Sequence, residues 1–314
     1  MKQMQKTFFA LGTANSVSVF YEEKKEALIM ETLNHIKSRT LLLDDMFSVF
    51  KENSEITKIN KAAGKKLVEV SPETYKIIQR AIEFSEVSRG AFDITAGSLS
   101  RLWRKAKKEN RVPDSEEIKK QKELTNYKKI IMDDNKVGLS QGGQEIDLGG
   151  IAKGYAADEA KKILMEANIM DAIINFGGSI ISIGDEKQIG IQNPDATTGI
   201  TMGRLKVKGQ AAVTSGLYER YFIKSGNQYH HLIDPKTGMP SQSGLLSVTL
   251  IGDSALEMDA LSTAVFVAGL EDGMKILEKY NTEVIVIDAH RDIFLTRGLV
   301  DKFAKDKEEI GNNE

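Results

Sequence analysis

Apolar residues recur at helical spacing through much of the first half of the chain. Across residues 23–47 they alternate with charges every three or four positions, which predicts a long amphipathic helix. A second helix is predicted from Ser71, since Ser-Pro-Glu supplies an N-cap with proline at the first helical position, and Gly90 is a typical C-terminal stop. A short strand is expected before them, at residues 16–21.

Residues 105–129 are the most polar stretch and mix charges of both signs. Asp114 and Glu117 have the spacing of a helix cap, so we expect an exposed helical excursion in this region. The charged end of the chain, residues 301–314, is expected to be a flexible tail.

The second half alternates compact apolar segments with helical patterns. Predicted strands cover residues 172–176, 188–192, 203–207, 211–215, 246–251 and 283–287. Predicted helices cover residues 151–166, 255–269 and 272–280. The mixture predicts an α+β fold, with a mixed sheet flanked by helices.

Composition then excludes several classes of function. Forty-three Lys and Arg balance 45 Asp and Glu, and no basic stripe appears, which argues against nucleic-acid binding. The absence of cysteine excludes disulfides, thiol catalysis and iron–sulfur clusters. Only four histidines occur, without an H-E-x-x-H motif, so a zinc hydrolase is not expected. No apolar run has the length of a membrane span, and residues 8–11 are too short for the core of a signal peptide.

Three glycine-containing corners are candidates for ligand binding: residues 147–154, 175–179 and 214–216. In the first, Gly149 and Gly150 directly precede a predicted helix, whose N-terminal amides could meet a phosphate while Lys153 adds a full charge. The alternative is that these glycines only permit a tight turn and that Lys153 is solvated.

Asp259 stands out within an apolar helical pattern that indicates a buried helix. Thr263 follows four residues later on the same helical face, and both side chains offer the hard oxygen atoms that suit Mg²⁺ together with phosphate and water. A purely structural role, with Asp259 satisfied by hydrogen bonds, remains open from spacing alone.

His230 and His231 end a short strand that leads into a proline and glycine turn. Because adjacent strand residues face opposite sides, at most one of them should point into a given cavity. That histidine could be catalytic or contact phosphate, or both could be packing or surface groups. Phe92, Asp93 and Trp103 could likewise belong simply to core and turn.

Taken together, these segments resemble the ApbE family, the FAD:protein FMN transferases. The similar stretches follow one another in family order from about residue 7 to about residue 297: 12–13, 47–60, 90–97 with Trp103, 147–158, 175–179, 214–216, 231–240 and 259–264. The resemblance implies an α+β, T-fold-like domain, expected over residues 1–300. It departs from the family at Leu11, where methionine is more frequent, and at Lys153, where some members carry glutamate.

The resemblance implies an enzyme that uses Mg²⁺, takes FAD as substrate, transfers FMN to a threonine or serine hydroxyl of another protein as a phosphoester, and releases AMP. The implied metal ligands are Asp259, Thr263 and the main-chain carbonyl of Gly150. Catalytic roles are expected for His231 and Asp259, either of which could be the base. The implied flavin-nucleotide contacts are Leu11, Ala91, Phe92, Asp93, Asp147, Lys153, Gly177, Gly178, Ser215, His231 and Ile233.

Two other activities are kept as alternatives: an FAD pyrophosphatase that yields FMN and AMP, and a non-catalytic flavin carrier. Family members are typically exported and lipid-anchored through a cysteine. We therefore expect a mature domain, with its leader and anchor absent from this sequence, that acts on an exported acceptor protein at the outer side of the cytoplasmic membrane and contacts that membrane only through the anchor.

Overall fold

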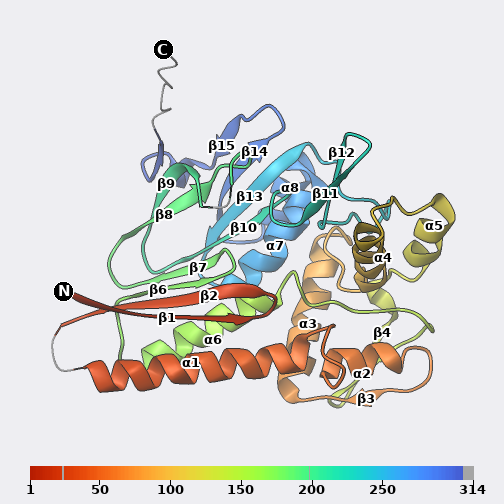
Figure 1. Cartoon of the computed structure of the whole chain (residues 1–314), viewed down its shortest axis with the longest axis horizontal. Helices are drawn as coiled ribbons and strands as arrows, with labels where there is room; N and C mark the ends of the chain where they lie inside the picture. Colours follow the sequence, from red (N-terminus) through yellow and green to blue (C-terminus); the bar gives the residue numbers. More distant parts are fainter. Residues whose placement is uncertain (23–24, 198, 307–314) are drawn as a thin grey trace.

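The computed structural model describes residues 1–22, 25–197 and 199–306. Its largest element is an eight-stranded sheet in the order β1-β2-β6-β7-β10-β13-β14-β15, in which each strand pairs with its neighbours in antiparallel register (Figure 1). The strands are β1 (Lys2–Ala10), β2 (Thr13–Tyr21), β6 (Ala172–Phe176), β7 (Ser179–Ile183), β10 (Ala211–Gly216), β13 (Leu245–Gly252), β14 (Glu283–Asp288) and β15 (Ile293–Leu295). The predicted α+β class is confirmed.

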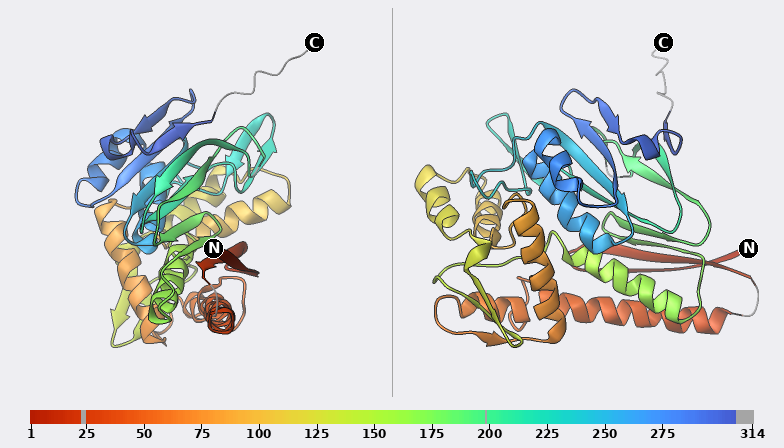
Figure 2. Two further views of the ribbon diagram at one scale, coloured as in Figure 1. Left: turned by 90° about the vertical axis from the view of Figure 1, so that its left-hand side faces the viewer. Right: turned by 180° about the vertical axis from the view of Figure 1, so that it is seen from behind.

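Helices cover one face of this sheet (Figures 1 and 2). α7 contacts β10 and β13, α6 contacts β6 and β7, and α1 contacts β1 and α6. The helices are α1 (Glu26–Phe47), α2 (Glu55–Lys61), α3 (Pro72–Val87), α4 (Gly97–Lys108), α5 (Ser115–Glu123), α6 (Ala152–Glu166), α7 (Ala255–Ala268) and α8 (Leu270–Leu277). None of the helices in the described ranges is long and apolar enough to cross a bilayer.

The opposite face is covered by a three-stranded sheet of β8 (Lys187–Gln192), β9 (Thr201–Val207) and β16 (Phe303–Lys305). Alternation along β14 explains this arrangement: Val284 and Val286 face the helices, while Ile285 and Ile287 join a second cluster with β8 and β9. The central strands are therefore buried on both faces, which is why they read as continuous apolar runs.

A small sheet, a hairpin and two 3₁₀ turns complete the fold within the described residues. A sheet of β3 (Val68–Glu69), β5 (Lys136–Leu139) and β4 (Ile130–Asp133) lies beyond α2 and α3, and a hairpin of β11 (Tyr221–Lys224) and β12 (Asn227–His230) stands beside α4. Two single 3₁₀ turns, Tyr127–Lys129 and Arg297–Leu299, precede β4 and β16.

The sequence predictions hold for all of the predicted helices and strands that lie within the described ranges. Ser71 caps α3, and Asp114 with Glu117 forms a full capping box on α5. The polar excursion is helical and exposed, but its first residues belong to α4, which packs through Trp103. The tail prediction is wrong for β16, whose backbone pairs with β9. The rest of the predicted tail, residues 307–314, and residues 23–24 of the first predicted helix lie outside the described residues.

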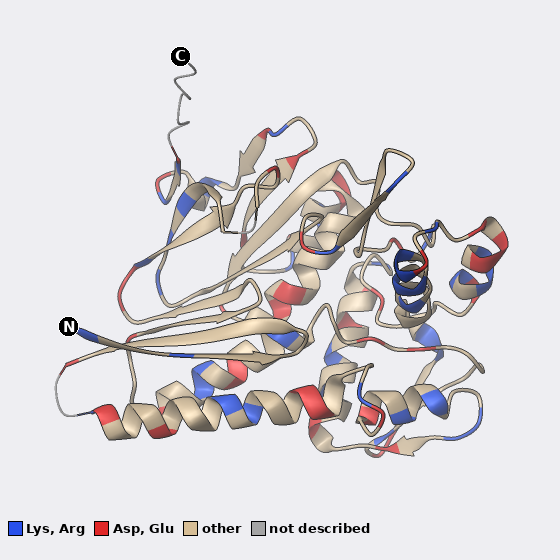
Figure 3. Cartoon of the chain, viewed as in Figure 1, with Lys and Arg blue, Asp and Glu red and all other residues tan. Residues whose placement is uncertain are grey.

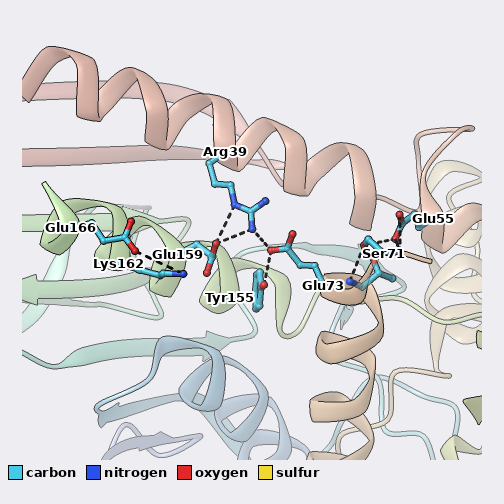
Figure 4. A network of polar contacts seen from close by, with 9 residues as sticks. Arg39, Glu55, Ser71, Glu73, Tyr155, Glu159, Lys162 and Glu166 are labelled. Carbon is cyan, nitrogen blue, oxygen red and sulfur yellow. Dashed lines mark hydrogen bonds and ion pairs between the residues drawn. The ribbon is translucent and has the colours of Figure 1, made fainter. Parts of the chain in front are cut away.

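A polar network joins three helices on the covered face (Figure 4). Arg39 on α1 donates to Glu159 of α6 over 2.8 Å and also pairs with Glu73 of α3. The hydroxyl of Tyr155, on α6, donates to Glu73 over 2.6 Å. Since these groups are partly shielded from water, the network ties α1, α3 and α6 together at the level where α6 begins.

Candidate functional site

One cleft of about 370 Å³ gathers most of the predicted site residues. It lies between the turn of β1 and β2, the start of α4, the loop before α6, the first half of α7 and the β11–β12 hairpin. The predicted residues on its wall are Leu11, Ala91, Phe92, Asp93, Asp147, Gly150, Lys153, Gly177, Ser215, His231, Ile233, Asp259 and Thr263.

Gly178 is the predicted contact that does not line this cleft. Its amide instead donates to the Asn175 side chain over 3.0 Å and closes the tight turn between β6 and β7. Gly177, the other residue of this turn, does reach the cleft, and a Cβ there would lie only 2.5 Å from the Thr13 side chain. The turn therefore needs glycine at position 177 for close packing.

Asp259 lies on the second turn of α7 and is 2% exposed. Its carboxylate accepts from the Lys153 ammonium over 3.0 Å and from the Gly154 amide over 2.9 Å. Lys153 is thus paired and partly buried, not solvated, and the positive end of α6 faces a carboxylate. The prediction of a buried helix bearing Asp259 is confirmed.

Thr263 lies one turn farther along α7, and its hydroxyl is 3.2 Å from the Ser215 hydroxyl. Gly150 is its neighbour across the cleft, since a Cβ built on Gly150 would lie 3.6 Å from the Thr263 hydroxyl oxygen and 3.1 Å from the Phe92 ring. The three predicted metal ligands therefore converge from two elements, α7 and the loop before α6.

Asp259, Thr263 and Gly150 offer oxygen atoms as metal ligands, and only the Asp259 carboxylate among them is charged. Among the residues that the structure describes, no three His, Asp or Glu side chains are grouped to hold a metal ion. One carboxylate, one hydroxyl and one main-chain carbonyl nevertheless fit Mg²⁺, which commonly takes one or two carboxylates and completes its shell with phosphate oxygens and water. Glycine at position 150 keeps a side chain out of the narrow space between this loop, the Phe92 ring and the Thr263 hydroxyl.

His230 and His231 point to different surroundings, as the alternation of side chains along a strand predicts. His230 is buried, its Nε2 lies 3.0 Å from the Ser241 carbonyl oxygen, and its ring packs against Phe266. His231 is open to the cleft. The protein atoms around it, and then the positive charge of Arg220, lower the pKa of His231 well below its ordinary value. His231 is therefore a neutral imidazole at pH 7, although the same surroundings make it a weaker base than a free histidine side chain.

Glu219 and Arg220 are cleft residues that the sequence reasoning missed. The Arg220 guanidinium donates to the Gly12 carbonyl over 3.0 Å and leaves other donors facing the cleft. Burial raises the pKa of Glu219, with a further contribution from Asp259, and Lys153 and Arg220 oppose this rise. In the sequence, Glu219 and Arg220 lie between the Thr214-Ser215-Gly216 corner and His231, and this position could have indicated that they belong to the site.

Two further carboxylates among the predicted site residues, those of Asp93 and Asp147, already accept hydrogen bonds from other protein groups. Asp93 accepts from the Thr95 amide and hydroxyl over 2.8 and 2.6 Å, and its second oxygen accepts from the Tyr127 amide over 3.1 Å. Burial raises the pKa of Asp93 despite these hydrogen bonds. Asp147 accepts from the Gly149 amide over 2.9 Å and from Arg104 over 3.0 Å. Both side chains therefore shape their loops.

Aromatic side chains form the other wall, and only Trp103 among them was noted from the sequence. The Trp103 ring stacks on Tyr229 with 5.5 Å between ring centroids, and Tyr229 stacks on Phe222 at 5.2 Å. The indole N–H of Trp103 donates to the Gly238 carbonyl over 2.8 Å. Phe50 is 72% exposed and lies under the Arg104 guanidinium at 5.1 Å. Planar apolar surfaces of this kind suit a flat ring system.

Positive charge concentrates at the rim beside this aromatic wall. α4 carries five Lys and Arg residues and no acidic residue, and its exposed turns are largely blue in Figure 3. Arg104 and Lys107 reach the cleft itself. A cleft with aromatic walls, a cationic rim and a set of oxygen donors can bind a planar ligand that carries phosphates.

The sequence matches the model of the ApbE family over residues 11–286. A protein of Klebsiella pneumoniae named FAD:protein FMN transferase is 38% identical over 81% of this chain and 81% of its own length. A Treponema pallidum protein of the same name is 28% identical over 96% of this chain and 89% of its own.

The fold is also similar to solved structures. The crystal structure of the ApbE protein of Thermotoga maritima has a TM-score of 0.85 and 35% identity, and the match covers 95% of this chain and 98% of that one. The flavin transferase ApbE of Vibrio cholerae has a TM-score of 0.81 at 23% identity, which supports the fold alone.

Proposed function

The chain belongs to the ApbE family, and from that premise we propose that it is an FAD:protein FMN transferase that works with Mg²⁺. It takes FAD as substrate, attaches FMN to a threonine or serine hydroxyl of an acceptor protein, and releases AMP. The observation that carries the proposal is the convergence of Asp259, Thr263, Gly150, Lys153 and His231 in one cleft. Export of the chain and a lipid anchor stay predictions.

The transfer exchanges one phosphorus–oxygen bond for another. The acceptor hydroxyl oxygen bonds to the phosphorus of the FMN half, and the bond from that phosphorus to the bridging oxygen of the pyrophosphate breaks. AMP leaves with the bridging oxygen, and the hydroxyl proton passes to a base. Such phosphoryl transfer depends chiefly on positioning and on electrostatic stabilisation.

His231 is the residue best suited to take that proton. Its imidazole is neutral and open to the cleft, whereas the Asp259 carboxylate already accepts from Lys153 and Gly154. These contacts support His231 over Asp259 as the base that we propose, a choice that the sequence alone left open.

The positively charged side chains of the cleft are placed to bind the negatively charged pyrophosphate of FAD. Lys153 lies at the start of α6, and Arg220 stands across from it on the segment that leads into β11, so together they can bind the pyrophosphate oxygens. Mg²⁺, for which Asp259, Thr263 and the Gly150 carbonyl would be ligands, would offset phosphate charge and stabilise the leaving AMP. The stacked Trp103, Tyr229 and Phe222 offer a surface for a planar ring of FAD.

Mass spectrometry of an exported candidate acceptor, incubated with this protein, FAD and Mg²⁺, tests the proposal. We expect the acceptor to gain one FMN as a phosphoester, with one AMP released, and both products to disappear in EDTA. Asp259→Asn should abolish the gain, while Asp301→Asn, at an exposed carboxylate, should not. Release of FMN and AMP without modification of a Thr- or Ser-bearing acceptor would instead indicate a pyrophosphatase.

A further inference from the structure

The candidate metal ligands belong to two helices, so their spacing depends on how those helices dock. Gly150 lies in the loop that leads into α6, whereas Asp259 and Thr263 lie on α7. The two helices touch closely at their N-terminal ends, where a Cβ on Gly154 would lie 2.2 Å from the Ala255 carbonyl oxygen. A small sliding of one helix along the other would therefore displace the ligands from one another.

Each helix caps the start of the other with a carboxylate. Asp158, on α6, accepts from the Ser254 hydroxyl over 2.8 Å, from the Ala255 amide over 2.9 Å and from the Leu256 amide over 3.0 Å. In the other direction Asp259, on α7, accepts from the Gly154 amide over 2.9 Å. We call these two carboxylates, Asp158 and Asp259, the reciprocal caps.

Asp158 fixes α7 more firmly than an ordinary N-cap would. Ser254 already caps α7 through the Glu257 amide, and the Asp158 carboxylate satisfies the two amides that this cap leaves unpaired in the first turn. Hydrogen bonds to an ionised carboxylate are stronger than neutral ones, and negative charge is favourable at a helix N-terminus. Asp158 itself does not line the cleft.

We propose that Asp158 is a positioning residue for the transfer site, which sets the position of Asp259 and Thr263 relative to Gly150. This inference rests on the proposed function, because it assigns Asp158 to the support of the ligands named there. Groups that orient metal ligands without touching the metal typically change metal affinity by about 10–100-fold when removed.

The test compares metal affinity with flavin affinity in Asp158→Asn. Asn keeps the size of the side chain but loses one acceptor oxygen and the charge. We expect the Kd for Mn²⁺, measured by electron paramagnetic resonance in the presence of FAD, to rise about 10-fold. The Kd for FAD in EDTA, measured by calorimetry, should stay within about twofold, since Asp158 does not line the cleft in which FAD would bind.

Controls separate positioning from general destabilisation. Ile189→Ala, in the second core cluster around β8 and β9, removes packing far from α6 and α7 and should lower Tm without changing the Kd for Mn²⁺. Ser254→Ala removes one donor to Asp158 and serves as a milder variant if Asp158→Asn does not fold.

The outcomes decide between the assignments. An unchanged Kd for Mn²⁺ in Asp158→Asn would overturn the positioning role, as would an equal loss in Ile189→Ala. Absence of Mn²⁺ binding in the wild-type protein with FAD would overturn the metal assignment of the proposed function together with this inference, and it would be seen before any variant is compared.

Discussion

His231 shows how burial, and after it neighbouring charge, adjusts the pKa of a single side chain. Its environment, including Arg220, lowers its pKa from the ordinary value near 6.5. A base must be unprotonated to act, so the rate of transfer should stay level as pH falls through 6.5 and decline only at a lower pH. We expect Arg220→Met to move that acid decline to higher pH, because removing the positive charge lets the imidazole protonate more easily.

Single-turnover rates from about pH 3 to pH 8 check this expectation, because the pKa of His231 is lowered to about 3. Arg297→Met, at an exposed arginine in the 3₁₀ turn before β16, is the matched control and should leave the profile unchanged. Half-loss of the wild-type rate near pH 6.5, or an acid decline that is identical in Arg220→Met, would contradict the role given to His231.

Residue-level prediction from the sequence succeeded where one element places the chemistry. The spacing of Asp259 and Thr263 needs only the period of one helix, and both residues line the cleft. Phe50 and Arg220 were missed, because Phe50 is exposed in a loop and Arg220 is joined to Gly12 across 208 residues. No local pattern encodes a contact of that separation.

At the level of elements, the contact between α6 and α7 makes Gly154 irreplaceable. Alanine usually stabilises a helix relative to glycine, by about 1 kcal/mol. Here its Cβ would meet the Ala255 carbonyl oxygen at 2.2 Å, so the helices must separate. We expect Gly154→Ala to lower the free energy of unfolding by about 1–3 kcal/mol and to slow transfer as well.

Urea denaturation and the transfer assay measure these two effects. Gly142→Ala is the control, since its Cβ would find its nearest neighbour at an ordinary distance of 3.9 Å. A Gly154→Ala protein as stable and as active as the wild type would show that the two helices can move apart without cost.

The network of Arg39, Glu73, Glu159 and Tyr155 should matter for stability alone, because it does not line the cleft. Tyr155→Phe removes the hydroxyl that donates to Glu73, and we expect the free energy of unfolding to fall by about 1 kcal/mol. Urea denaturation checks the loss, with Tyr75→Phe on α3 as control, since the Tyr75 hydroxyl has no hydrogen bond within the described part of the chain. A slower transfer at equal stability would contradict this purely structural role.

Most of the elements missed by the sequence pattern are short or lie at the edge of a sheet. β1 is a polar strand at the edge of the main sheet, so it lacks the apolar run that marks β13 and β14. β15 and β16 have three residues each, too few to show a period. β7 was also missed, although it is buried inside the main sheet, because Ser179 and Ser182 interrupt its apolar run. Most other buried elements were predicted, because burial on one or both faces imposes the pattern itself.

On the scale of the whole molecule, the cleft joins the β1–β2 turn at one edge of the main sheet with the end of β10 in its interior, the first half of α7 and the α4 region. A ligand that touches all of them stabilises the native chain, since the unfolded chain has no such site. At an FAD concentration 100 times its Kd we expect a gain of about 2.7 kcal/mol in the free energy of unfolding. Urea denaturation with and without FAD measures it.

Riboflavin is the control for that measurement, because it carries the isoalloxazine ring of FAD without either phosphate and without the adenosine. It should stabilise the protein less than FAD at the same concentration, since Lys153 and Arg220 then gain no anionic partner. Equal stabilisation by both compounds would place the binding energy in the rings alone and argue against a pyrophosphate site.

The chain has a single tryptophan, and that residue, Trp103, is part of the cleft wall in stacking contact with Tyr229. All of the indole fluorescence of the protein therefore originates at the place where substrate would enter. Flavins absorb light in the range where tryptophan emits, so a flavin on this wall would quench the emission by energy transfer. The protein carries its own optical probe of occupancy, and arrival and departure of the nucleotide can be timed in solution without a label.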